Sequence, residues 1–180
     1  MRRGRWGLPR ITRTPVEPPD HGFGRSRGGL STEAHQRVDG HGLPPVMMIT
    51  PGQASDSPIL VPLLGEFRVA RPLGGPRTRP DKLRGDKAYP SRVIRHHLRA
   101  RGIESVIPEP RDQQGHRVRH GSRGGRPVTY DPVAYKQRNV IERSFCRLKQ
   151  WCGLATRYDK LAIVYREAVV LNAVIAWLRQ

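Results

Sequence analysis

The segment from residue 82 to residue 107 constrains the fold more than any other part of the chain. Lys82–Asp86 is a short strand pattern that ends on an acid, a helix is predicted over about 90–101, and 103–107 is a second strand pattern. Gly102 ends the helix, because glycine readily adopts the left-handed conformation found at helix C-termini. Strand, helix and strand in this order predict a βαβ unit, so we expect an α/β fold with a parallel pair of strands.

A β-hairpin is predicted upstream of this unit. His35–Asp39 and Pro45–Thr50 flank the glycine-rich residues 40–42, and two short strands around such a turn are typical of a hairpin. The second arm is almost continuously apolar, as in a strand that is buried on both faces. A short apolar helix is predicted from Ser57 to about Phe67, with Ser57 as its N-cap and Pro58 at the first helical position.

A helical pattern runs from about Pro132 to Trp151. At about 100° per residue, one arc of this helix holds Tyr135, Arg138, Glu142, Phe145 and Lys149, and the arc beside it holds Val140, Ile141, Leu148 and Trp151. If the apolar arc packs on a sheet, Glu142 is held between two cations on a rigid element, as a metal-binding or catalytic acid would be. An ordinary amphipathic helix with a solvated Glu142 fits the same pattern.

A further helix is predicted from about Leu161 to Leu178. It is apolar on nearly all faces, so we expect the rest of the protein to cover it. Trp151 and Trp177 are expected in the core because their neighbours are apolar. The two cysteines, Cys146 and Cys152, are too few for a disulfide framework or a zinc site, and we expect free thiols in a reducing cytoplasm.

The charge of the chain indicates a polyanionic partner. The formal net charge is +18 and the pI is near 11.4, and such a field attracts phosphate backbones and releases their counterions. Nucleic acid is the expected partner. A membrane is not, because no apolar run reaches the about 18 residues of a spanning helix and the N-terminus lacks the apolar stretch of a secretory signal.

The organisation predicted from composition is one domain with a basic arm. Residues 1–29 mix arginine, glycine and proline and are expected to be mostly unstructured. Residues 30–180 form the folded domain. Residues 109–128 are rich in arginine, glycine and histidine with almost nothing to bury, so we expect a disordered basic loop there, or one that DNA orders.

Two acids in this arrangement suit divalent metal chemistry. Asp86 is predicted just beyond the carboxyl end of a parallel strand, where α/β proteins bind ligands, and Glu142 is on a helix that can pack beside it. Carboxylate oxygens favour Mg²⁺ or Mn²⁺ over zinc. Paired divalent ions activate a water or a 3′-hydroxyl for in-line phosphoryl displacement, which cleaves and joins DNA strands. A helix-capping or turn role for Asp86 is the alternative.

The spacing of four residues in the helix is more specific. Two residues separate Tyr135 from Arg138, three separate Arg138 from Glu142, and six separate Glu142 from Lys149. This spacing resembles the tyrosine, arginine, glutamate, lysine signature of bacterial insertion-sequence DDE transposases. The flanking residues 139–145 and 155–160 are similar to the same family, and the resemblance covers about residue 24 to the C-terminus. It implies a ribonuclease-H-like core, a mixed sheet flanked by helices, in which Asp86 and Glu142 are the second and third catalytic acids and hold Mg²⁺ or Mn²⁺.

The resemblance also implies a set of DNA contacts. Arg138 and Lys149 would contact phosphates of the transposon ends, the terminal inverted repeats, and Tyr135 would position the helix or the DNA strand. Lys87 and Arg143, which adjoin the two acids in the sequence, are the other candidate DNA-binding residues.

One part of the family pattern is not found. The first catalytic aspartate of the family lies on the central strand, just before the hairpin, but here that region is rich in arginine, proline and glycine and its only aspartate is Asp20. Asp39 and Asp56 match the hairpin and the following loop instead. The first catalytic strand is therefore expected to be missing, and buried backbone groups left unpaired by its loss cost about 1–3 kcal/mol each.

The functional prediction is a truncated transposase that is inactive as an isolated chain. It would be a decayed copy or the downstream half of a frameshifted protein, with intact transposase or the product of the upstream frame as a partner. The alternative is a non-catalytic basic DNA-binding protein or regulator derived from a transposase.

Overall fold

The computed structural model of the chain describes residues 16–87, 89 and 91–179. Its strands form an antiparallel sheet, β1-β2-β3, and a parallel pair, β4-β5. The fold is therefore mixed α/β, as the sequence predicts. In chain order the elements are β1 Gly24–Ser26, β2 Gly29–Arg37, β3 Val46–Pro51, α1 Asp56–Gly65, β4 Lys82–Arg84, α2 Arg92–Ala100, β5 Glu104–Val106, α3 Arg111–Arg119, the 3₁₀ helix Gly121–Gly124, α4 Pro132–Lys136, α5 Asn139–Lys149, α6 Cys152–Ala155 and α7 Ala162–Leu178.

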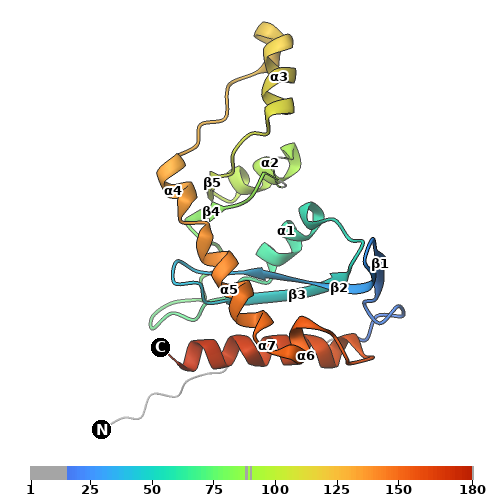
Figure 1. The fold of residues 1–180 in the computed structure, drawn as a ribbon. Helices are drawn as coiled ribbons and strands as arrows, with labels where there is room; N and C mark the ends of the chain where they lie inside the picture. Colours follow the sequence, from blue (N-terminus) through green and yellow to red (C-terminus); the bar gives the residue numbers. More distant parts are fainter. Residues whose placement is uncertain (1–15, 88, 90, 180) are drawn as a thin grey trace.

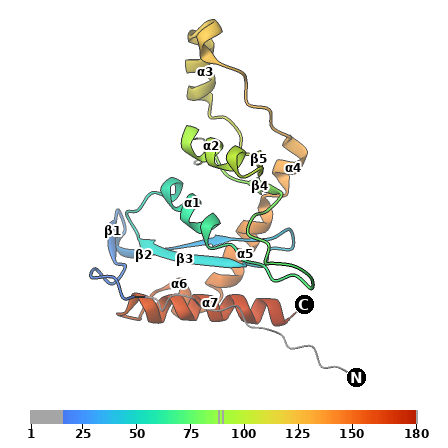
Figure 2. The same cartoon turned by 180° about the vertical axis from the view of Figure 1, so that it is seen from behind.

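The elements are stacked in layers (Figure 1). Helix α7 runs along one face of the antiparallel sheet, and α1 covers the opposite face. Beyond α1 lie β4, β5 and α2, and α3 projects at the end farthest from α7, as the view from behind also shows (Figure 2). Helices α4 and α5 descend along one side from the parallel pair to α7, so they connect the two sheets.

The predicted hairpin is confirmed. Strands β2 and β3 pair antiparallel, with His35 opposite Met48, and the turn contains Gly42 at φ 85°, a conformation that favours glycine. Successive side chains of a strand point to opposite faces. Met47 accordingly belongs to an apolar cluster with residues of α7. Val46 and Met48, on the other face, pack with Leu63 of α1 and with Phe67, which follows that helix.

The predicted βαβ unit is also confirmed. Strands β4 and β5 are parallel, and α2 connects them. The hydroxyl of Ser91 caps α2 by accepting a hydrogen bond from the N–H of Ile94 at 3.1 Å, and Gly102 at φ 62° follows its end. The predicted helix start at Pro90 lies outside the described residues.

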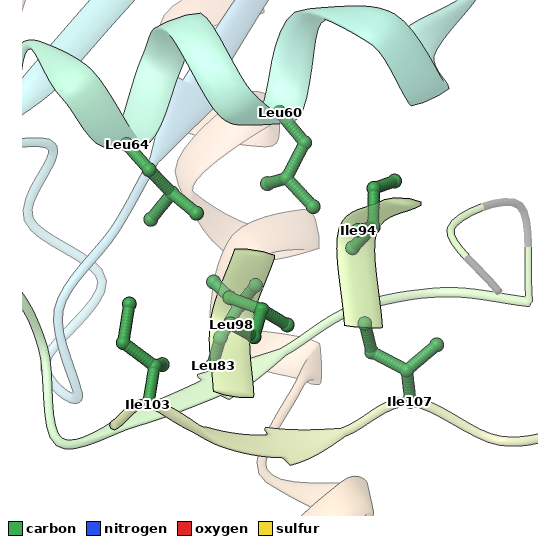
Figure 3. Close-up of a cluster of buried hydrophobic side chains, with 7 residues drawn as sticks. All are labelled: Leu60, Leu64, Leu83, Ile94, Leu98, Ile103 and Ile107. Carbon is green, nitrogen blue, oxygen red and sulfur yellow. The ribbon is translucent and has the colours of Figure 1, made fainter. Parts of the chain in front are cut away.

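The core of the βαβ unit packs against α1 (Figure 3). Leu60 and Leu64 of α1 point toward the residues of α2 and the strands, and all seven side chains of this cluster are buried: Leu60, Leu64, Leu83, Ile94, Leu98, Ile103 and Ile107. Leu63, one residue away on α1, packs with Val46 of the antiparallel sheet. Helix α1 therefore joins the two sheets through apolar contacts on two sides.

Helix α1 begins earlier than predicted. Its N-cap is Ser55 rather than Ser57, and no side chain caps the first turn. Asp56, Ser57 and Pro58 are thus the first three helical residues. Proline is tolerated there, because the N–H groups of the first turn have no partner within the helix.

The single helix predicted over 132–151 is wrong, because the chain forms α4 and α5 with a break at Gln137 and Arg138. The Nε–H of Arg84, on β4, donates a 2.9 Å hydrogen bond to the carbonyl of Ala134. A continuous helix would give that carbonyl to the N–H of Arg138, which instead bonds Tyr135 at 2.9 Å. The tertiary contact from β4 therefore accounts for the break.

The prediction that the C-terminal helix is covered on nearly all faces is wrong. Helix α7 buries one stripe, Ala162, Tyr165, Val169 and Ala173, and its other apolar residues remain partly exposed. Trp177 is 44% exposed and Trp151 is 41% exposed, so neither is a core residue. In the described part of the chain, no helix is long and apolar enough to cross a membrane.

Two segments predicted as irregular contain regular structure. Within 109–128 the chain forms α3 and the short 3₁₀ helix, and Arg117 pairs with Glu109 at 3.0 Å. Helix α3 buries no residue, so hydrophobic periodicity gave no signal for it. In the predicted arm, β1 pairs with the start of β2 around Gly29 at φ 109°. Residues 1–15 of the arm lie outside the described residues.

The two sheets are separated by a cavity of about 620 Å³. It is lined from one side by β2 and the residues after it, from the other by residues 80–85, and also by parts of α1 and α5. Among the described residues no strand joins β2 to β4. Among the described residues, 32–37 of β2 pair only with β3 and β4 pairs only with β5, and residues of both segments line this cavity.

Candidate functional site

The site predicted from the sequence lies just beyond the end of β4. Asp86 is two residues past the end of this strand, and the break between α4 and α5 lies beside it. Arg84 joins the end of β4 to this break. It donates hydrogen bonds to the carbonyl of Ala134 at 2.9 Å and to the side-chain oxygen of Gln137 at 2.5 Å. The sequence analysis did not identify Arg84 or Gln137, because an arginine in a short strand carries no signal of its partner.

Arg138 brings the two predicted acids together. Its NH1 nitrogen lies 3.6 Å from Oδ2 of Asp86 and 3.3 Å from Oε1 of Glu142. Both carboxylates therefore contact one and the same nitrogen atom. The side chains of Asp86 and Glu142 are 50% and 55% exposed, so each pair is open to solvent and contributes only modestly to stability.

Tyr135 belongs to the same group. Its hydroxyl donates a 3.3 Å hydrogen bond to Oδ1 of Asp86, and the guanidinium of Arg138 lies 5.6 Å from the centre of its ring. Burial raises the pKa of Tyr135, Arg138 lowers it, and the Asp86 carboxylate raises it, with a net rise. The phenol therefore stays protonated at neutral pH and acts as a donor to Asp86.

The remaining predicted residues are Lys87, Arg143 and Lys149. The backbone N–H of Lys87 donates to Oδ1 of Asp86 at 2.6 Å, and its side chain is exposed. Arg143 and Lys149 are exposed on α5, and neither forms an ion pair within the described residues. All three side chains are thus available to an external anion.

The donors of this group suit a hard divalent cation. The two carboxylates supply oxygen ligands of the kind that Mg²⁺ and Mn²⁺ prefer. The positive guanidinium of Arg138 lies against both carboxylates. The two acids therefore attract a cation to this position. The residues therefore fit a divalent ion.

A second polar group borders the cavity and was not predicted. Glu33, His35 and Asp56 offer ligand atoms that all lie within 4.8 Å of one another. The only sequence signal was the spacing of Glu33 and His35, two apart on a strand, which puts them on one face. Asp56 comes from the helix that packs on this face.

Comparison with known proteins identifies the family. The model of a protein family described as "Transposase DDE domain" matches residues 12–178 of the chain. The chain belongs to the DDE transposase family. It is also 30% identical over 175 residues to a protein of Burkholderia cepacia named as a transposase for insertion sequence element IS402, and the alignment covers 96% of this chain and 71% of that protein. No solved structure matches the chain.

Membership of the family bears on the two functional hypotheses raised by the sequence. It supports a role in transposition and, with it, DNA binding and a divalent metal ion. It does not favour the alternative of a non-catalytic basic DNA-binding protein.

Proposed function

We propose that this transposase binds Mg²⁺ or Mn²⁺ through Asp86 and Glu142 and acts on the phosphodiester bonds at the ends of an insertion sequence. The observation that supports this is the convergence of both carboxylates on one nitrogen of Arg138, beyond the end of a parallel strand. When bound, the ion supplies Lewis-acid stabilisation of the leaving oxygen and activates the attacking hydroxyl.

The protein residues have distinct roles in this proposal. Asp86 and Glu142 hold the ion, and Tyr135 orients the Asp86 carboxylate through its hydrogen bond. Arg138 would leave the two carboxylates when they hold the ion and would then bind a DNA phosphate. Lys87, Arg143 and Lys149, whose side chains are exposed, add phosphate contacts.

We further propose that the fold is ribonuclease-H-like and lacks its central strand. The cavity between β2 and β4 supports this, because it separates two sheets that one strand between them would join. The first catalytic acid of the family lies on that strand. The described chain accordingly provides two of three acids, and we expect it not to transfer strands alone. Intact transposase or the product of an upstream frame is the proposed partner.

A metal-binding experiment tests the assignment of the acids. Mn²⁺ binding is followed by electron paramagnetic resonance for the full chain, Asp86→Asn and Glu142→Gln. Each substitution is expected to weaken binding at this site by about tenfold or more, since it removes one anionic ligand. Glu104→Gln is the matched control, because Glu104 is an exposed glutamate that pairs with Lys82 away from the site. Equal Mn²⁺ affinity in all four proteins would contradict the assignment.

A second experiment tests the incompleteness of the site. A DNA duplex with the terminal inverted repeat of the parent element is incubated with the full chain and Mn²⁺. We expect binding without 3′-end processing or strand transfer. Strand transfer that Glu142→Gln abolishes would show that the chain is active alone and that the proposed missing strand is not required.

A further inference from the structure

A group of metal-binding side chains lies apart from the Asp86 and Glu142 pair. Glu33 and His35 are two residues apart on β2, so both point to the face that α1 covers. Asp56 is the first residue of α1. The three side chains offer one nitrogen and two carboxylate oxygens that all lie within 4.8 Å of one another.

The ring of His35 is held in one orientation. It is 7% exposed, and its Nε2 lies 2.7 Å from the hydroxyl of Thr50 on β3. Its other nitrogen, Nδ1, faces Asp56 with a separation of 3.3 Å. A histidine that ligates a metal through one nitrogen is usually held by a hydrogen bond at the other. Thr50 provides that bond here.

The charges of the group are not balanced within it. Asp56 and Glu33 are both acids, and their carboxylate oxygens lie within 4.8 Å of each other and of a ring nitrogen of His35. Two neighbouring carboxylates beside an imidazole favour a cation among them, since like charges at this distance repel.

We propose that Glu33, His35 and Asp56 form a second metal site, which binds a divalent transition-metal ion such as Zn²⁺ or Mn²⁺. One imidazole nitrogen with two carboxylates is a donor set that suits these ions, whereas Mg²⁺ prefers oxygen ligands alone. The site differs from the Asp86 and Glu142 pair in its nitrogen ligand and in its elements, β2 and α1. It does not depend on the function proposed above.

The accessibility of the group permits metal entry. The side chain of Asp56 is 42% exposed, and all three residues line the 620 Å³ cavity between the sheets. An ion can therefore reach the ligands without unfolding of the hairpin. A bound ion would tie β2 to the first turn of α1, which is a structural effect independent of catalysis.

Zinc binding to the full chain provides the test. Isothermal titration with Zn²⁺ is performed on the unsubstituted protein, Glu33→Gln, His35→Gln and the double variant Asp86→Asn with Glu142→Gln. We expect one equivalent of tight binding that falls by at least about tenfold in the first two variants and is retained in the double variant. Co²⁺ absorption spectra report on the same ligands, and loss of the nitrogen ligand in His35→Gln should change the spectrum.

Controls separate the proposal from misfolding and from the other site. Circular dichroism checks the fold, and Glu33→Gln is informative even if the buried His35→Gln protein unfolds. Thr50→Val should weaken zinc binding by about tenfold without abolishing it, because it removes only the orienting hydrogen bond. Unchanged zinc affinity in a folded Glu33→Gln protein, or loss of tight binding in the double variant, would overturn the proposal.

Discussion

Arg138 holds three groups of the proposed catalytic site in contact. Its guanidinium touches Asp86 and Glu142, and it lies over the ring of Tyr135. Because the break between α4 and α5 occurs at this residue, its side chain is placed by the chain geometry as well as by the ion pairs. A single positive charge thus pairs with two negative ones, and the group of Arg138, Asp86 and Glu142 keeps a net negative charge.

Removal of the Arg138 side chain should affect metal binding and DNA binding in opposite directions. In Arg138→Ala, Mn²⁺ affinity is expected to rise by about two- to fivefold, because an exposed competing ion pair is worth up to about 1 kcal/mol. DNA affinity is expected to fall, because a phosphate contact is lost. Titration of Mn²⁺ and a DNA mobility-shift assay measure the two effects.

Arg143→Ala is the matched control for this experiment. Arg143 is an exposed arginine on α5 that pairs with neither acid, so its loss should weaken DNA binding and leave Mn²⁺ affinity nearly unchanged. If Arg138→Ala weakened Mn²⁺ binding, the guanidinium would support the ion rather than compete with it.

Among the elements, α7 depends on a residue far away in the sequence. The two carboxylate oxygens of Glu17 accept hydrogen bonds from the backbone N–H groups of Ala162 and Ile163 at 2.8 and 2.9 Å. These are N–H groups of the first turn, which have no partner within the helix. An acid is also favourable at this end of the helix dipole. Glu17 therefore fastens the N-terminal region to the start of α7.

The cap predicts an acid-dependent loss of stability. Desolvation raises the pKa of Glu17, but the N–H donors of Ile163 and Ala162 and the contact with His21 lower it more, so the folded-state pKa lies below its usual value of 4.5. The unfolded state then binds more protons as the pH falls through 4.5, and the folded state loses stability in that range.

Urea unfolding at about pH 6 and about pH 4 measures this effect. The stability difference between the two pH values should be smaller in Glu17→Gln than in the unsubstituted protein, because glutamine does not titrate. Glu66→Gln, a change at an exposed glutamate, should keep the full difference. An equal pH dependence in Glu17→Gln and the unsubstituted protein would contradict the role of the cap.

The elements also show what the sequence could and could not predict. The hairpin, the βαβ unit and the position of α7 followed from local patterns of apolar residues and turns. The break at Arg138 did not, because it depends on a hydrogen bond from Arg84, fifty residues earlier in the chain. Helix α3 was missed because it buries no side chain. The exposure of Trp177 depends on which face of α7 meets the sheet.

The same distinction applies to the candidate site. The spacing of Tyr135, Arg138 and Glu142 on a helical pattern predicted that they lie near one another, and the structure brings them to Asp86. The group of Glu33, His35 and Asp56 was not predicted, because its third member comes from a different element.

For the molecule as a whole, the net charge of +18 should dominate contact with DNA that lacks a specific site. Binding to such a duplex is expected to weaken steeply with salt, because each neutralised phosphate releases counterions and adds about −0.9 to the slope of log K against log salt. Helix α3 and the residues after it contribute to this field, since they project from the rest of the fold (Figure 1).

A triple substitution tests the contribution of this projection. Arg111, Arg119 and Arg123 are exposed, so their replacement by alanine should leave the core intact and reduce the magnitude of the salt slope by up to about 2.7. Fluorescence anisotropy at several salt concentrations measures the slope. Val118→Ala, on the same helix and 71% exposed before the change, is the neutral control. An unchanged slope in the triple variant would place the DNA contact elsewhere.

The arrangement of α1 between the two sheets has a consequence for synthesis of the protein. The hairpin, α1 and the βαβ unit are consecutive in the chain and can fold as soon as they leave the ribosome, whereas α5 and α7 are synthesised after them. Glu142 reaches Asp86 only when α5 has docked. A nascent chain in which α5 has not yet docked therefore presents only one of the two acids at the proposed metal site.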